Sequence, residues 1–180
     1  TLNLSPQRVY GSYKEMIRTE SSLPANERMD IVSIVTPNHV HFGPSKMAIE
    51  NGFHVICDKP LSFNLEEAYE LQQVVKRSDR IFALTHNYTG YPMVKQAKQM
   101  IKHGDLGKIR KVVVEYPQGW LSTLLESTGQ AQASWRTDPK KSGKAGCMGD
   151  IGTHAFNMAE YVTGLQTTKI CSNLNIVVEG

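Results

Sequence analysis

The sequence predicts an α/β fold with a parallel sheet, and three adjacent stretches support that prediction. Ile31–Val35 is a short apolar run rich in β-branched residues, as expected of a strand buried on both faces of a parallel sheet. Residues 42–50 have a helical pattern that ends at Asn51-Gly52, and Phe53–Cys57 is a second apolar run. Strand, helix and strand within about thirty residues form a βαβ unit, whose crossover should be right-handed.

The segments on either side extend this unit. Asn64 and Glu67 have the spacing of a capping box, which predicts a helix that runs to about Lys76. The other elements predicted in residues 1–89 are a helical turn or two around Lys14–Ile17 and a strand over Ile81–Thr85.

Residues 90–180 predict a second, α+β domain, with the boundary near Thr89–Pro92. Its predicted elements are a helix over Met93–His103 that stops at Gly104, a strand over Ile109–Tyr116, a loop over Pro117–Ala145, a helix over residues 146–163 closed by Gly164, and a strand over Thr168–Val178. The exposed faces of the two strands indicate that copies of the protein associate through this sheet, so we expect a homo-oligomer.

Composition limits what the chain can be. Of its 180 residues 40% are hydrophobic, which is enough for a real core. The net charge of +3 is modest and the signs are mixed, so Lys76-Arg77 and Lys140-Lys141 indicate solvated faces rather than a nucleic-acid surface. The three cysteines (Cys57, Cys147 and Cys171) lack metal-ligand spacing and fit reduced thiols in a cytoplasmic protein. No apolar run has the length of a membrane span, and no secretory signal is visible.

Polar residues directly follow the first two predicted strands. Thr36-Pro37-Asn38 comes after the first strand, and Asp58-Lys59-Pro60 comes after the second. Because the strands are parallel, both motifs should lie at the carboxyl edge of the sheet, where open α/β sheets bind ligands. The plainer alternative is an asparagine helix cap in the first motif and a solvated lysine turn in the second.

The order TPNHVH, helix, HVICDKP resembles the second half of the nucleotide-binding domain of one enzyme family. This is the glucose–fructose oxidoreductase/inositol dehydrogenase (Gfo/Idh/MocA) family of NAD(P)-dependent oxidoreductases, and the likeness covers almost the whole chain. Asp58 stands where the family usually has glutamate, which keeps the charge. The resemblance implies the C-terminal half of a Rossmann-type parallel sheet domain over residues 1–89. The start of an α+β substrate and dimerisation domain would then occupy residues 90–180.

One expected feature is missing from the sequence. The family places a glycine-rich loop for the dinucleotide at the start of its chains, and no Gly-x-Gly-x-x-Gly occurs here. The resemblance therefore implies an internal fragment of a longer protein. We expect the 180 residues alone to be inactive and to bind dinucleotide weakly or not at all.

The segment GCMGDIGTHAFNMAEYVTG contains a second signal. Asp150 and His154 are four residues apart, so a helix would place them on one face. A carboxylate beside an imidazole suits a general base, because it fixes the ring and favours its protonated form. Taken alone, the spacing is more often that of a capping aspartate and a surface histidine. Preceded by Trp135-Arg136 and by Gly143, Gly146 and Gly149, it matches the catalytic helix of the family.

The resemblance also implies the roles of individual residues. The catalytic set is Lys59, Asp150 and His154, in which Lys59 stabilises a developing alkoxide and His154 takes the proton. The cofactor, NAD or NADP, would be bound by Thr36, Pro37, Asn38, Asp58, Lys59, Asn87, Trp135 and Arg136. No metal is expected, because the histidines are scattered without the spacing that zinc requires.

The resulting hypothesis is an oxidoreductase that transfers a hydride between NAD(P) and a hydroxyl-bearing carbon of a sugar, polyol or sugar derivative. One alternative within the same fold is a lyase or glycosidase that uses NAD transiently. Another is a non-catalytic regulatory subunit that senses dinucleotide, although the joint presence of Lys59, Asp150 and His154 argues against it. The expected partner is a small sugar or polyol, with no nucleic acid and no membrane.

Overall fold

The computed structural model describes residues 4–175, and these form two compact units. The first unit contains residues 4–85 together with residues 140–144, and the second contains residues 86–139 and 145–175. Within the described range, every helix is too short or too polar to cross a membrane.

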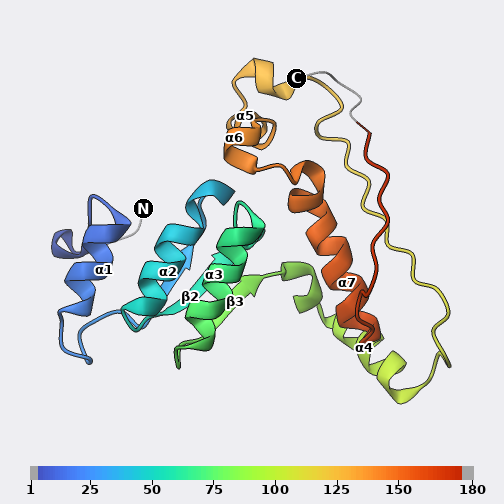
Figure 1. Ribbon diagram of the computed structural model, residues 1–180, viewed down its shortest axis with the longest axis horizontal. Coiled ribbons are helices and arrows are strands. Elements are labelled where there is room, and N and C mark those ends of the chain that lie inside the picture. The colour runs from blue at the N-terminus through green and yellow to red at the C-terminus, as the bar shows by residue number, and fades with distance from the viewer. Residues whose placement is uncertain (1–3, 176–180) are drawn as a thin grey trace. The chain divides into compact units, whose positions relative to one another are not determined.

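The first unit is built on a three-stranded parallel sheet in the order β1-β2-β3 (Figure 1). Its elements are α1 (Tyr13–Ser21), β1 (Ile31–Ile34), α2 (Phe42–Glu50), β2 (His54–Asp58), α3 (Leu65–Lys76) and β3 (Phe82–Thr85). Ile31 is paired with His54, and Val55 with Phe82. The predicted βαβ unit is therefore confirmed and continues through a second crossover to β3.

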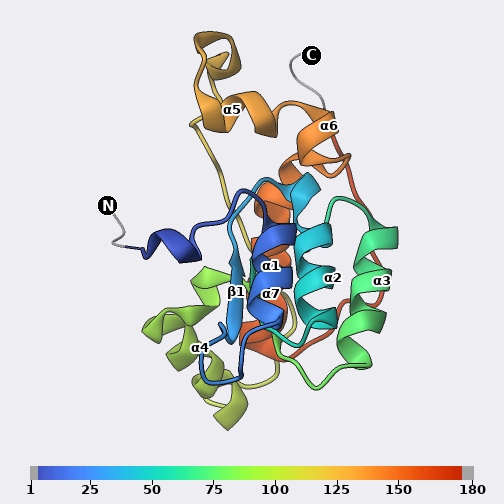
Figure 2. The same ribbon diagram turned by 90° about the vertical axis from the view of Figure 1, so that its left-hand side faces the viewer.

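Helices α1, α2 and α3 cover one face of the sheet. The two crossovers step in the same direction along it, which places α2 and α3 on the same side. Figure 2 shows α1 beside them in a single layer. The core lies between this layer and the sheet. Its fully buried apolar side chains are Ile17, Val32, Ile34, Ala48, Ile49, Phe53, Val55 and Cys57.

The prediction that the first strand is buried on both faces is wrong, and the second strand is not buried on both faces either. In β1, Val32 and Ile34 are buried, but Ile31 is 51% exposed. In β2, Val55 and Cys57 are buried while Ile56 is exposed. A strand turns successive side chains to opposite faces, so this alternation follows directly from having helices on one side only. Among the described residues, no helix of the first unit covers the second face.

Helix α3 begins with the predicted capping contact. The side chain of Asn64 accepts a hydrogen bond from the Glu67 backbone at 2.8 Å, and the Glu67 carboxylate accepts one from the Phe63 backbone at 3.0 Å. Helix α1 is longer than its weak pattern predicted. It begins at the cap Ser12, whose hydroxyl accepts from the Glu15 backbone at 3.1 Å.

The second unit consists mainly of helices and extended segments. Its helices are α4 (Pro92–His103), α5 (Ala131–Arg136) and α7 (Thr153–Thr163), preceded by a π-helical turn over Met148–Gly152. Helix α6 (Pro139–Ser142) contributes residues 140–142 to the first unit. Short 3-10 helices cover Asn87–Gly90 and Leu125–Thr128 in this unit, and Pro6–Arg8 and Asn38–Val40 in the first unit. The predicted helix stops Gly104 and Gly164 both cap helices in the left-handed conformation.

Two predictions for this unit are wrong. Pro117–Ala145 is not only a loop, because α5 and α6 lie within it; the cap of α5 is Gln130, an uncommon residue at such a position. Neither Ile109–Tyr116 nor residues 168–175 form a strand, since no ladder pairs them within residues 4–175. Alternating apolar residues indicate an exposed face but do not supply a partner edge. The remainder of Thr168–Val178 lies outside the described residues, and association through this sheet stays a prediction.

Candidate functional site

The carboxyl edge of the first unit's sheet gathers five of the residues predicted to bind a cofactor. Thr36, Pro37 and Asn38 follow β1, and Asp58 and Lys59 lie at the end of β2. Asp58 is paired with Thr85 at the end of β3, and the Thr85 hydroxyl donates to the Asp58 carboxylate at 2.7 Å. Asp58 and Lys59 are both half-buried. The parallel register therefore fixes the place of these residues, while their binding roles stay predictions.

Asn38 is not the helix cap that the plainer interpretation suggested. Its side chain is buried, and its amide nitrogen donates to the Ser142 carbonyl at 3.1 Å. Segment 140–144 is held against this turn at a position that admits only glycine. Gly143 has a φ of 83°, and a Cβ atom there would lie 2.8 Å from the Phe63 carbonyl oxygen. The glycine that the family resemblance singled out is thus required by backbone geometry.

The sequence interpretation missed His41 as a contact between the two motifs. It is completely buried, and its ring nitrogens lie 2.8 Å from the Pro60 carbonyl oxygen and 2.7 Å from the Thr36 carbonyl oxygen. The available signal was its place in the sequence, three residues after Asn38 and just before α2. The pattern of apolar residues does not report such a contact.

In the second unit His154 lies among aromatic rings. It is the second residue of α7 and is 7% exposed. The Tyr88 ring packs edge-on against it with the ring centres 4.6 Å apart, and the His86 ring lies 5.8 Å away. The His86 ring also contacts the Thr153 hydroxyl at 2.9 Å. These contacts orient the predicted base.

A cavity of about 490 Å³ opens beside this histidine. Its lining residues are Tyr88, Tyr91, Val114, Glu115, Tyr116, His154, Ala155 and Met158. Tyr88 and Tyr116 share a short hydrogen bond through their hydroxyl groups. That hydrogen bond, together with partial burial, raises the pKa of Tyr88. Tyr88 therefore stays protonated at neutral pH and contributes a polar but uncharged wall.

Asp150 lies in the π-helical turn that leads into α7, not in a regular α-helix shared with His154. Such turns are frequent at functional sites. The Arg136 side chain donates to the Asp150 carboxylate at 3.4 Å, and its guanidinium lies 4.2 Å from the centre of the Trp135 ring. In this unit Arg136 holds Asp150, and its binding of the cofactor stays a prediction. Asn87 is exposed in the 3-10 helix before α4.

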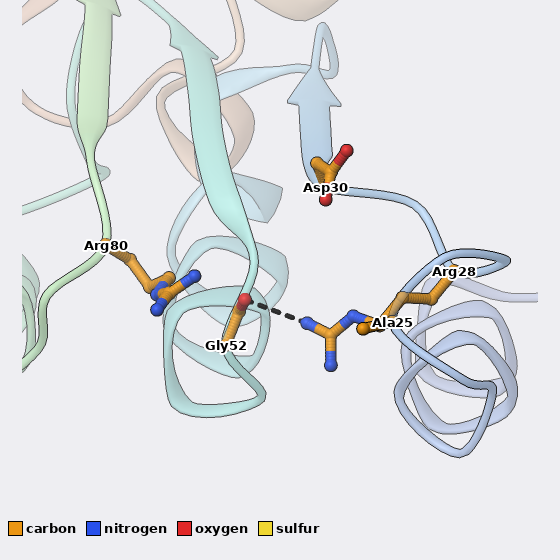
Figure 3. A pocket seen from close by; sticks show the side chains of 5 residues that line it. All are labelled: Ala25, Arg28, Asp30, Gly52 and Arg80. Carbon is orange, nitrogen blue, oxygen red and sulfur yellow. Dashed lines mark hydrogen bonds between the residues drawn. The ribbon is translucent and has the colours of Figure 1, made fainter.

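A second cavity, of about 310 Å³, lies at the opposite, amino-terminal end of the sheet (Figure 3). Its lining residues are Ala25, Arg28, Asp30, Gly52 and Arg80. Arg28 donates to the Gly52 carbonyl at 2.8 Å, and its guanidinium lies 4.3 Å from the centre of the Phe53 ring. Arg80 pairs with the neighbouring Asp79. The two cations are therefore engaged within the fold, and Arg28 caps the C-terminal end of α2.

Within residues 4–175, no three histidine, cysteine or acidic side chains are grouped as a metal site would require. Cys57 is buried in the core, and burial is the main reason that the pKa of its thiol is raised to about 11. It is therefore an inert packing residue at neutral pH.

Comparison with known families divides the chain in two. Residues 8–86 match the profile of the oxidoreductase family with an NAD-binding Rossmann fold. Residues 94–180 match that of the GFO/IDH/MocA C-terminal domain.

Individual relatives agree with these profiles. The uncharacterized oxidoreductase YfiI of Bacillus subtilis is 33% identical over 161 residues, which are 89% of this chain and 40% of that protein. An inositol dehydrogenase homolog from Azotobacter vinelandii, solved in complex with NAD+, has a TM-score of 0.81 and 38% identity over 88% of this chain and 40% of that one. Levoglucosan dehydrogenase in complex with NADH and levoglucosan has a TM-score of 0.68 and 34% identity, covering 76% of this chain and 35% of that one. The chain thus spans about two fifths of the length of the relatives it matches.

Proposed function

Because the chain belongs to the Gfo/Idh/MocA family of oxidoreductases, we propose that the full-length protein is an NAD(P)-dependent dehydrogenase. Its substrate would be a sugar, polyol or sugar derivative, oxidised at a carbon that bears a hydroxyl group. The solved relatives with NAD+, and with NADH and levoglucosan, support this choice of partners. The observation that carries the proposal is the cavity of about 490 Å³ with His154 in its wall.

The carboxyl edge of the sheet fits the nicotinamide coenzyme. Open parallel sheets bind dinucleotides at this edge, and Thr36, Asp58 and Lys59 supply hydroxyl, carboxylate and ammonium groups there. When bound, the coenzyme supplies the hydride acceptor. Asp58 would accept a hydrogen bond from a ribose hydroxyl, because a carboxylate that accepts one bond from Thr85 can still accept others. NAD and NADP are both candidates.

His154 is proposed as the general base. Histidine is the side chain suited to exchanging protons near neutral pH, and this ring lines a cavity of the size of a small sugar. The protonated Tyr88 beside it does not compete for the proton. Asp150, held by Arg136, would orient a substrate hydroxyl or the imidazole. The Lys59 ammonium would stabilise the negative charge that develops on the substrate oxygen.

Two substitutions in the full-length protein test these roles. His154→Ala and Lys59→Ala should each lower kcat by about a hundred- to ten-thousand-fold, because each removes a group that acts in the transition state. In His154→Ala the Kd for NAD or NADP, measured by calorimetric titration, should stay close to the wild-type value. His103→Ala, in an exposed position of α4, is the matched control and should keep wild-type kcat. Wild-type turnover in either test variant, on a sugar that the wild type oxidises, would contradict the assignment.

A further inference from the structure

The two turns at the carboxyl edge of the sheet are joined by one buried side chain. His41 lies between α2 and the turn after β1, and none of its surface is exposed. Its Nε2 atom lies 2.7 Å from the Thr36 carbonyl oxygen, and its Nδ1 atom lies 2.8 Å from the Pro60 carbonyl oxygen. A single ring thus spans from the turn after β1 to the turn after β2.

Both contacts place a carbonyl oxygen opposite a ring nitrogen. Carbonyl oxygens only accept hydrogen bonds, so a ring nitrogen can bond either of them only by donating. An imidazole N–H can sit on either nitrogen, so the ring can donate to either carbonyl. Burial keeps water from competing for these contacts.

The two carbonyls belong to the segments that carry the proposed coenzyme residues. The Thr36 carbonyl begins the Thr36–Asn38 turn, and the Pro60 carbonyl directly follows Lys59. Within the sheet, the ladder between β1 and β2 pairs residues up to Ile34 and Cys57. Beyond that point His41 links the two backbone segments that follow β1 and β2. The charged residues beside its partner Pro60 are Asp58 and Lys59, and Asp58 is engaged by Thr85.

We propose that His41 is a positioning residue for the coenzyme: through the contacts of its two ring nitrogens with the Thr36 and Pro60 carbonyls it fixes the distance between the Thr36–Asn38 turn and Lys59. The inference rests on the proposed function, because it concerns the same coenzyme site. His41 touches neither coenzyme nor substrate; it acts through the two backbone segments. Its loss should weaken coenzyme binding more than it slows the chemical step.

The test compares two substitutions in the full-length protein. His41→Leu introduces an apolar side chain of similar volume and removes both ring nitrogens, so the Kd for NAD or NADP should rise about tenfold or more. His41→Gln keeps an amide that can donate to one carbonyl, and its Kd should rise about threefold. At saturating coenzyme, kcat should fall by a smaller factor than the Kd rises in both variants. His103→Leu, which replaces an exposed histidine of α4, should leave Kd unchanged.

The outcomes separate the inference from the function on which it rests. Coenzyme affinity that falls in the order wild type, His41→Gln, His41→Leu supports the positioning role of His41. Unchanged Kd in the folded Leu variant overturns it, and so does a folded Gln variant with wild-type Kd if the Leu variant does not fold. A lower melting temperature together with wild-type Kd shows a merely structural histidine and also overturns it. If the wild-type protein binds neither NAD nor NADP, the proposed function itself fails and this inference falls with it.

Discussion

The two units of the molecule hold their polar groups in different surroundings. In the first unit Glu20, Asn38 and His41 are buried beside a continuous apolar core. In the second unit, within the described residues, Ala133 is the one fully buried apolar side chain, and His154 is buried among aromatic rings instead. Large apolar side chains such as Val113 and Ile170 are exposed there.

Stability and site geometry therefore have different sources in the two units. In the first unit, sheet ladders and core packing fix the backbone, and the polar edge follows from the ends of the strands. In the second unit, ring contacts around His154 and the Arg136–Asp150 pair place the candidate residues. Substitutions of buried polar groups should therefore destabilise the first unit strongly, and substitutions of surface contacts should have small effects on the second.

Glu20 provides the strongest test. Its carboxylate is buried and accepts hydrogen bonds from Tyr10 at 2.5 Å, from Arg8 at 2.7 Å and from the Met29 backbone at 3.0 Å. Glu20→Ala leaves the Met29 N–H and the Tyr10 hydroxyl without this acceptor. We expect the free energy of unfolding to fall by about 2–3 kcal/mol. Urea unfolding followed by circular dichroism measures the loss, with the exposed Glu27→Gln as the control.

The same carboxylate gives the stability a defined pH dependence. Burial acts to raise the pKa of Glu20, but the hydrogen bonds from Tyr10 and Met29 and the charge of Arg8 outweigh it, so the pKa is lowered. A carboxyl group with a lower pKa in the folded state stabilises the fold at pH values above its unfolded pKa, near 4.5. That contribution disappears as the pH falls through the folded pKa. Glu20→Gln should remove this part of the acid dependence; an unchanged acid profile would show that the carboxylate is not ionised in the fold.

The predictability of the fold follows the same division. Helix α2 was predicted with the bounds Phe42–Glu50 that the structure has, and its C-terminal end is marked by Asn51-Gly52. Pairing between strands that are close together in the sequence can be predicted from such patterns, because one helix and its two turns connect the strands. Ile109–Tyr116 alternates just as a strand does, yet strand formation depends on a partner edge that no local pattern encodes.

The candidate site divides in a similar way. Strand ends place Thr36 and Lys59 at one edge, and this follows from parallel pairing alone. The contacts of His41 depend on which carbonyl groups face its ring. The ion pair of Arg136 with Asp150 depends on the π-helical turn that contains Asp150. Those details arise from tertiary packing, so residue spacing in the sequence does not contain them.

Arg28 should show an effect of intermediate size. Its guanidinium donates to the Gly52 carbonyl at the end of α2 and lies over the Phe53 ring. Arg28→Met keeps an unbranched apolar side chain but removes the charge, so we expect a loss of about 1 kcal/mol in the free energy of unfolding. Arg80→Met is the matched control in the same cavity (Figure 3). Within residues 4–175, the ion pair of the Arg80 side chain is with the adjacent Asp79. Equal losses in both variants would mean that the helix-end contacts of Arg28 add nothing.

Lys98 should show the smallest effect, and it tests the second unit. Its ammonium on α4 lies 3.8 Å from the centre of the Tyr161 ring on α7, a half-exposed contact between two helices. Lys98→Met keeps the length of the side chain and removes the charge, so the expected loss is about 0.5 kcal/mol. Lys95→Met, exposed on the same helix, is the control for the change in net charge. A loss as large as that of Glu20→Ala would contradict this difference between the units, because one surface cation would then stabilise the second unit as much as a buried carboxylate stabilises the first.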